Sequence, residues 1–318
     1  MTGTLVHAPA RPRISVVIDA GTRELTGRIP VQRMLEAPVR EAASLPAGAV
    51  EIVVTSASPA GSCPLPHGVR WLVLPDHGYY ALKNAGAREA RGSYVVFWDG
   101  DCCPEPGYLR HAESLLDANP SCSAVSGVTE YAGKGWLTRL NTVLSFGYLH
   151  QGRAEPWPAA ALAHNLVIRR AAFGSQPFGP HRGRSGGDTH ITETARASGQ
   201  PIRLDQRLRV QHEDPSRSLT ALLERHLREH FNPMVGRPHR RDAMRVAWRR
   251  VRRSPWRRHR KLRRSGGALG LGRADLLAAT GAVLAYTALD SAALCVLALR
   301  RDLLAAWLHY QLGREAAP

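Results

Sequence analysis

Two aspartates one residue apart are the side chains of this sequence whose types and spacing most clearly suggest chemistry. Asp99 and Asp101 come directly after the apolar run Tyr94–Trp98, within the stretch G-S-Y-V-V-F-W-D-G-D-C. β-Branched and aromatic residues predict a buried strand for that run, and open α/β sheets bind ligands beyond the carboxyl ends of their strands. Gly100 lets the two carboxylates converge on one hard divalent cation, which keeps positions open for phosphate oxygens. By itself, such a pair is equally typical of an ordinary turn.

The segments around this pair alternate between strand and helix patterns. Strands are predicted near residues 13–18, 51–55, 69–74, 94–98, 124–128, 162–169 and 202–210. Helices are predicted near residues 25–44, 80–90, 108–118, 133–150, 188–198 and 219–231. This alternation predicts an α/β fold with a doubly wound, mostly parallel sheet.

The C-terminal third of the chain has a different composition. Residues 237–264 hold fourteen Lys and Arg against one acid, so they carry +13 of the net charge of +17. Such a cluster suits nucleic acid or an anionic membrane surface, with Trp248 and Trp256 at headgroup depth. The apolar run 274–299 that follows favours the membrane, although Asp290 disfavours a simple span. We expect a basic helical region followed by a helical anchor that lies on or in the membrane, with a span as second choice and a buried helix pair as the alternative.

Two further patterns have ordinary readings. The five cysteines match no zinc pattern and are odd in number, and the N-terminus lacks the apolar run of a signal peptide, so a reduced cytoplasmic setting is the simplest expectation. Residues 226–230 spell the inverted zinc-protease motif H-x-x-E-H. Because arginines surround that motif, we favour a solvated helix face.

The aspartate pair belongs to a longer ordered block. Upstream lie Gly78 and the run K-N-A-G-A-R-E-A-R-G-S-Y of residues 83–94, together with the apolar strands 15–18 and 51–54. This block resembles the family 2 glycosyltransferases of the GT-A fold, over roughly residues 13–215. The resemblance implies metal-dependent, inverting transfer of a sugar from a nucleotide-diphosphate donor to a hydroxyl acceptor.

The same resemblance suggests which residues hold the donor. It implies that Asp101, assisted by Asp99, holds Mg²⁺ or Mn²⁺ against the diphosphate, where a cation stabilises the developing negative charge. Asp99 and Lys83 would also lie near the nucleotide. The alternative for Lys83 is an exposed lysine near the start of a helix.

A second block carries the predicted base. The sequence runs from Gly186-Gly187-Asp188 through a predicted helix, Gly199 and a predicted strand to His212. This order resembles the family segment whose aspartate deprotonates the acceptor. An inverting transfer needs a base opposite the leaving group, and the resemblance assigns this role to Asp188. Its alternative is a helix N-cap. His212 is expected as a metal or diphosphate ligand, or simply as a histidine at a strand end.

Three departures from the family pattern leave the donor open. The first strand leads into Asp19-Ala20-Gly21-Thr22, where the family has P-x-x-N. Ser56 occupies the position of the aspartate that binds the nucleotide base in the family. Gly187 occupies the position of the glutamate that precedes the catalytic aspartate in the family. Ser56 can bind a base, but less strongly than a carboxylate. These losses make a decayed GT-A binding or scaffold protein at the membrane the main alternative, and a nucleic-acid-binding protein a weaker one.

We therefore expect a tail at residues 1–12, a GT-A-like domain at 13–215, a basic helical region at 216–265 and an apolar, membrane-associated helical tail at 266–318. The expected partners are a nucleotide sugar and an anionic membrane surface. The tail favours a lipid-linked or envelope-related acceptor and a location at the inner face of the cell membrane.

Overall fold

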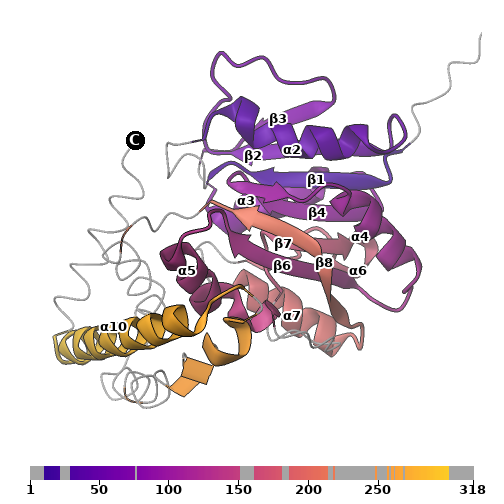
Figure 1. Cartoon of the computed structure of the whole chain (residues 1–318). Helices are drawn as coiled ribbons and strands as arrows, with labels where there is room; N and C mark the ends of the chain where they lie inside the picture. Colours follow the sequence, from indigo (N-terminus) through magenta and orange to yellow (C-terminus); the bar gives the residue numbers. More distant parts are fainter. Residues whose placement is uncertain are drawn as a thin grey trace, which may run out of the picture. The chain divides into compact units, whose positions relative to one another are not determined.

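Figure 1 shows a computed structural model of the 318-residue chain. It describes residues 11–21, 29–75, 77–150, 161–180, 186–213 and 269–300, together with 218, 248, 256–257, 259–260 and 262–267. The chain divides into two compact units. The first comprises residues 1–130 and 152–213, and the second comprises residues 131–151 and 214–318.

An eight-stranded sheet forms the first unit, in the order β3-β2-β1-β4-β7-β6-β8-β5. The strands are β1 (Ile14–Asp19), β2 (Val50–Ser56), β3 (Val69–Val73), β4 (Tyr94–Asp99), β5 (Cys102–Pro104), β6 (Ala124–Tyr131), β7 (Asn165–Arg169) and β8 (Ile202–His212). The pairs β3–β2, β2–β1 and β1–β4 are parallel, as predicted, whereas β4–β7, β7–β6 and β5–β8 are antiparallel. The sheet is therefore mixed. An antiparallel pair needs no crossover connection between its two strands.

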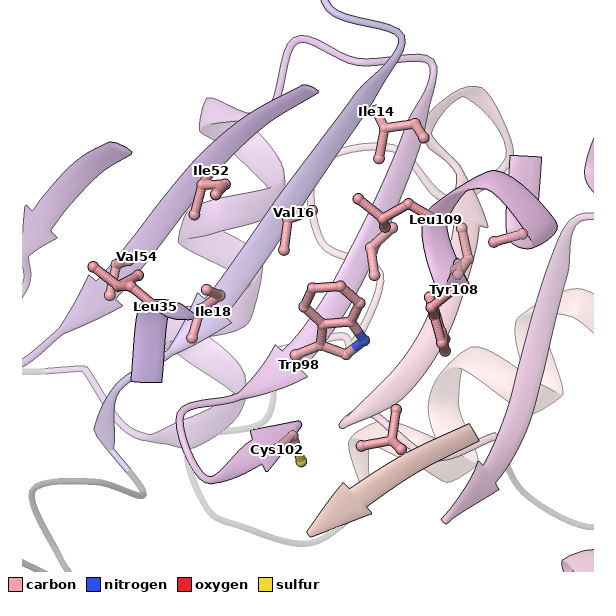
Figure 2. Packing of buried hydrophobic residues seen from close by; sticks show 14 of the residues in the cluster. Ile14, Val16, Ile18, Leu35, Ile52, Val54, Trp98, Cys102, Tyr108 and Leu109 are labelled. Atoms are coloured by element: carbon pink, nitrogen blue, oxygen red, sulfur yellow. The ribbon is translucent and has the colours of Figure 1, made fainter. Parts of the chain in front are cut away.

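Helices cover both faces of this sheet, as the doubly wound prediction requires. They are α2 (Val31–Ala43), α3 (Tyr79–Glu89), α4 (Tyr108–Asp117), the short α6 (Arg170–Phe173) and α7 (Gly187–Ala197). Buried side chains of α2 and α4 belong to one apolar cluster, part of which is drawn in Figure 2. Side chains of α3 and α7 belong to a second cluster.

The strand β4 lies between these two clusters. Tyr94, Val96 and Trp98 contribute to the first, and Val95 and Phe97 to the second. Because successive side chains of a strand point to opposite faces, a continuous apolar run is what a strand covered on both sides requires. This burial fixes the end of β4, where the aspartate pair follows.

The second unit contains α5 (Trp136–Phe146), the 3₁₀ helix η1 (Gly147–His150) and the long helix α10 (Arg273–Leu299). Its core unites buried side chains of α5 and α10 with Leu262 and Leu271, and Arg139 pairs with Asp275 at 3.5 Å. In the described part of the chain, no helix is both long and apolar enough to cross a membrane. Most of the expected basic helical region at 216–265 lies outside the described residues, and so does the helix predicted near 219–231 with its H-x-x-E-H motif.

Candidate metal and donor site

The antiparallel pair β5–β8 places His212 beside the aspartate pair, although more than a hundred residues separate them. Cys102 is in register with His212, and the amide of Glu213 donates to the carbonyl of Asp101 at 3.0 Å. Gly100 donates its amide to the carbonyl of Asp19 at 2.8 Å. A Cβ at Gly100 would lie only 3.2 Å from that carbonyl oxygen. The glycine thus allows the tight passage from β4 to β5.

Four potential metal ligands meet at this point. One donor atom from each of Asp99, Asp101, Cys102 and His212 lies within 4.8 Å of all the others. The Nε2 atom of His212 is 3.5 Å from Oδ1 of Asp101 and 4.0 Å from Oδ2 of Asp99. Its Nδ1 lies 2.9 Å from the carbonyl oxygen of Glu213, which can only accept a hydrogen bond, so Nδ1 carries the ring proton. Nε2 is therefore the nitrogen that can bind a cation, and the donor set fits a divalent ion.

Two side chains of α3 contact Asp99, and one of them, the buried Lys83, favours its ionised form. The Nζ atom of Lys83 lies 2.6 Å from Oδ1 of Asp99 and 3.2 Å from the carbonyl of Trp98, and the Tyr79 hydroxyl donates to Asp99 at 3.0 Å. Burial raises the pKa of Asp99, but the Lys83 ammonium and two histidines outweigh it, so the pKa is lowered to about 2. Burial alone would lower the pKa of Lys83. The negative charge of Asp99 outweighs this effect, so the pKa of Lys83 is raised. Oδ2 of Asp99 lies 3.1 Å from the Tyr79 hydroxyl and 4.0 Å from Nε2 of His212.

Lys83 itself is completely buried. The alternative prediction, an exposed lysine near the start of a helix, is therefore wrong. The ammonium contacts Asp99 and a backbone carbonyl, and its effect on a bound nucleotide would pass through Asp99. The surrounding helix contains small residues. A Cβ added at Gly86 would come within 2.3 Å of Val17, which shows how closely α3 packs on the sheet.

We predict that Lys83→Met lowers the free energy of unfolding at pH 7 by about 3–5 kcal/mol, because it leaves a buried carboxylate without its cation. The depressed pKa of Asp99 contributes stability above the ordinary carboxyl pKa, and this contribution is lost as pH falls toward 2. The difference between variant and wild type should therefore shrink as pH falls from about 4 toward 2. Urea unfolding at pH 7 and close to pH 2 measures it.

The matched control is Arg88→Met, which removes an exposed cation from the same helix. It should change the unfolding free energy by about 0.5 kcal/mol or less. An equal loss in both variants, or a loss independent of pH, would show that the Lys83–Asp99 pair does not stabilise the fold.

Asp188 lies in the first turn of α7 and is half-buried. Its Oδ1 accepts the amide of Ala163 at 2.8 Å. The N-cap of the helix is Gly186, with no side-chain cap bond, so the alternative of Asp188 as N-cap was wrong. Burial raises the pKa of Asp188 to about 7, against the lowering effects of the Ala163 amide and of Lys83. A carboxyl group with this pKa can take up a proton near neutral pH.

The glycine before Asp188 has a physical explanation. A Cβ at Gly187 would lie 2.5 Å from the ring of Tyr80, which is buried. The Tyr80 hydroxyl in turn is hydrogen-bonded to Asp188. A glutamate at position 187 would require the Tyr80 ring to move, so the departure from the family pattern is matched by a tyrosine on α3.

Ser56 and Asp19 end two neighbouring strands at the same edge of the sheet. Ser56 is buried, and its Oγ accepts the amide of Ser58 at 3.0 Å. Asp19 is in register with Asp99, and its Oδ1 accepts the amide of Gly21 at 2.8 Å. From the sequence we expected Asp19 only as a departure from the family pattern, although it ends a buried strand just as Asp99 does.

Comparisons with known proteins agree with this geometry. The family model described as Glycosyl transferase family 2 matches residues 44–175. Glycosyltransferase AglE from Haloferax volcanii is 26% identical over 125 residues, which are 39% of this chain and 41% of that protein. The match thus spans about two-fifths of that relative's length.

Among solved structures, the mannosyltransferase PcManGT from Pyrobaculum calidifontis, in complex with GDP-Man and Mn²⁺, superimposes with a TM-score of 0.51. It is 20% identical, and the alignment covers 92% of this chain and 88% of that one. This likeness confirms the GT-A-like fold expected from the sequence.

Proposed function

We propose that this chain, which belongs to glycosyl transferase family 2 through residues 44–175, transfers a sugar from a nucleoside-diphosphate donor to a hydroxyl acceptor. The observation that carries the proposal is the cluster of potential metal ligands Asp99, Asp101 and His212 at the carboxyl ends of the parallel strands. These residues would hold Mg²⁺ or Mn²⁺. The cation, when bound, would offset the negative charge that develops on the leaving diphosphate.

The residues around the cluster have complementary roles in this proposal. Lys83 and Tyr79 orient Asp99, and the carbonyl of Glu213 orients His212. Such supporting bonds fix the direction of a ligand before the cation arrives. Ser56 lies at the end of β2, where a parallel sheet presents its ligand edge, and this supports a contact with the nucleotide.

We assign to Asp188 the role of general base. Its half-buried carboxylate feels the charges of both Lys83 and Asp99, which supports a place next to the donor site. A base at this point takes the proton of the acceptor hydroxyl while the diphosphate leaves from the opposite side of the sugar. The product would then have the inverted anomeric configuration.

A lipid-linked or envelope-related acceptor and a position at the inner face of the membrane complete the proposal. Residues 237–264 carry +13, and each Lys or Arg close to anionic lipid contributes about 1 kcal/mol of attraction. Leu277 and Leu284 of α10 are 76% and 54% exposed, and Trp256 is 69% exposed. Exposed apolar side chains beside a basic segment are typical of a helical region that lies on a membrane.

The double variant Leu277→Glu/Leu284→Glu should bind vesicles of anionic phospholipid about 100-fold more weakly, since burial of each leucine is worth about 1.5 kcal/mol or more. Both side chains lie on one face of α10, seven residues apart. Flotation of the full-length protein with vesicles measures the change.

The control is Ala278→Glu/Ala285→Glu, which adds the same charge at the same spacing on exposed positions of the same helix but removes little apolar area. Its binding should fall much less. Equal binding of all three proteins, or no flotation of the wild type, would remove the membrane from the proposal.

The donor is tested by a screen of nucleoside diphosphates and their sugars for thermal stabilisation. We expect one nucleotide series to raise the melting temperature with Mn²⁺ or Mg²⁺ present, and little effect with EDTA, because a ligand that binds only the folded state stabilises it. Stabilisation that does not depend on the cation would contradict the proposed site.

A further inference from the structure

We infer that Cys102 makes the cation site of this chain a binding site for thiophilic divalent ions of the zinc class, held by Asp99, Asp101, Cys102 and His212 together. Only the effect of this binding on sugar transfer rests on the proposed function. The binding itself follows from the geometry of the four side chains.

The sulfur lies on the same side of the β5–β8 pair as the imidazole. Cys102 and His212 are directly opposite each other in an antiparallel pair, and opposite residues of such a pair project to the same face. The Sγ atom is 4.0 Å from Oδ1 of Asp101. Figure 2 shows Cys102 on the short strand just after the end of β4.

Three of the six separations between the donor atoms approach those of a tetrahedral zinc site, and all six are within 4.8 Å. With zinc bond lengths of about 2.0–2.3 Å, a tetrahedron places N and O about 3.4 Å apart and S and O about 3.6 Å apart. The corresponding separations here are 3.5 and 4.0 Å from His212 Nε2 to the two carboxylates and 4.0 Å from Cys102 Sγ to Asp101. Small side-chain movements would close the tetrahedron.

The donor set also selects among cations. Mg²⁺ prefers oxygen ligands in octahedral geometry, whereas thiolate and imidazole favour Zn²⁺. On binding, the Cys102 thiol gives up its proton to solvent and the sulfur forms the bond to the ion. No electron is transferred, so the step needs no oxidant or reductant.

This coordination has a consequence for transfer. Four protein donors fill the tetrahedral shell of Zn²⁺, whereas a catalytic site keeps a position open for substrate. Zn²⁺ bound in this way would leave no place for the donor diphosphate. The site would therefore take Mg²⁺ or Mn²⁺ for transfer and be closed by Zn²⁺.

Cobalt absorption of the full-length protein, without nucleotide, tests the binding. Co²⁺ replaces Zn²⁺ in such sites, and a bond from thiolate to Co²⁺ adds an intense charge-transfer absorption in the near ultraviolet. We expect this absorption in the wild type, its loss in Cys102→Ser, and its displacement by added Zn²⁺. The Zn²⁺ affinity of Cys102→Ser should fall by about 100-fold, and its Mg²⁺ affinity much less.

Cys103→Ser is the matched control, because Cys103 is the adjacent and exposed cysteine and is absent from the donor cluster. It should keep the absorption. Persistence of the absorption in Cys102→Ser would overturn the inference, and so would Co²⁺ binding to the wild type without any sulfur charge transfer. The wild-type spectrum decides even if a variant fails to fold.

The outcomes also separate this inference from the proposed function. A protein that shows the sulfur-to-cobalt absorption but does not turn over any sugar donor would keep the inference and remove the function. A protein that turns over a donor with Mn²⁺ but shows no such absorption would do the reverse.

Discussion

Replacing Asp101 by Ala is expected to lower turnover of the sugar donor by about 1,000-fold or more, a barrier increase of about 4 kcal/mol. The carboxylate lies 3.5 Å from Nε2 of His212 and belongs to the cluster of potential metal ligands, not to the apolar core. Its removal takes one ligand from the cation that would stabilise the leaving diphosphate. The measurement is the rate of nucleoside-diphosphate release with saturating Mn²⁺.

The fold should survive this change, since Asp101 lies next to another buried acid and its loss relieves repulsion. A cooperative thermal transition at an unchanged or higher temperature would show this. Glu36→Ala, an exposed acid on α2, is the control and should keep the wild-type rate. Activity of Asp101→Ala within about threefold of wild type, a difference well below 1.4 kcal/mol, would remove Asp101 from the mechanism.

The second large effect is expected for Asp188→Asn, which should lower the transfer rate by about 100- to 10,000-fold while nucleotide binding persists. The amide oxygen of Asn can still accept the amide of Ala163, so the side chain keeps its position and loses only its basicity. Single-turnover transfer at saturating donor measures the rate, and a binding isotherm for the nucleotide measures the affinity.

The dependence on pH gives an independent readout. Burial raises the pKa of Asp188 to about 7, and only the ionised form is a base, so the wild-type rate should rise with pH through about that value and then level off. A bound cation would shift this limb to lower pH. The residual rate of Asp188→Asn should lack the limb. Weakened nucleotide binding with normal transfer at saturating donor would show that the assigned role is wrong.

All strands of the sheet except the short β5 could be predicted, as could the position of the aspartate pair, because they depend on local pattern. The run Tyr94–Trp98 is apolar at every position, and the structure extends β4 over Tyr94–Asp99. Side chains that end adjacent parallel strands must meet at one edge, which places Asp19 beside Asp99. These features follow from periodicity and from the geometry of parallel sheets.

The supporting contacts could not be predicted, because they depend on how distant segments pack. The antiparallel return of β8 next to β5 brings Cys102 to His212, and a cysteine that matches no zinc spacing gives no signal of this. Lys83 is buried because small residues allow α3 to approach the sheet closely, whereas lysine alone predicts exposure. Both contacts arise from the packing of segments that are distant in sequence.

The fit between Gly187 and Tyr80 bears on the alternative of a decayed protein. The missing glutamate is accompanied by a buried tyrosine whose ring fills the space a Cβ would need and whose hydroxyl is hydrogen-bonded to Asp188. Position 187 is therefore closely packed and Asp188 keeps a polar partner, as the proposed active site requires.

The most direct test of the central claim is hydrolysis or transfer of nucleotide sugars by the purified full-length chain, followed as release of nucleoside diphosphate. We expect release from at least one donor with Mn²⁺ or Mg²⁺, its loss on addition of EDTA, and its loss in Asp101→Ala. Release that continues unchanged in EDTA, or that Asp101→Ala retains, would contradict a cation-dependent glycosyltransferase. Tight nucleotide binding without turnover of any donor would instead identify the chain as a binding protein on this fold.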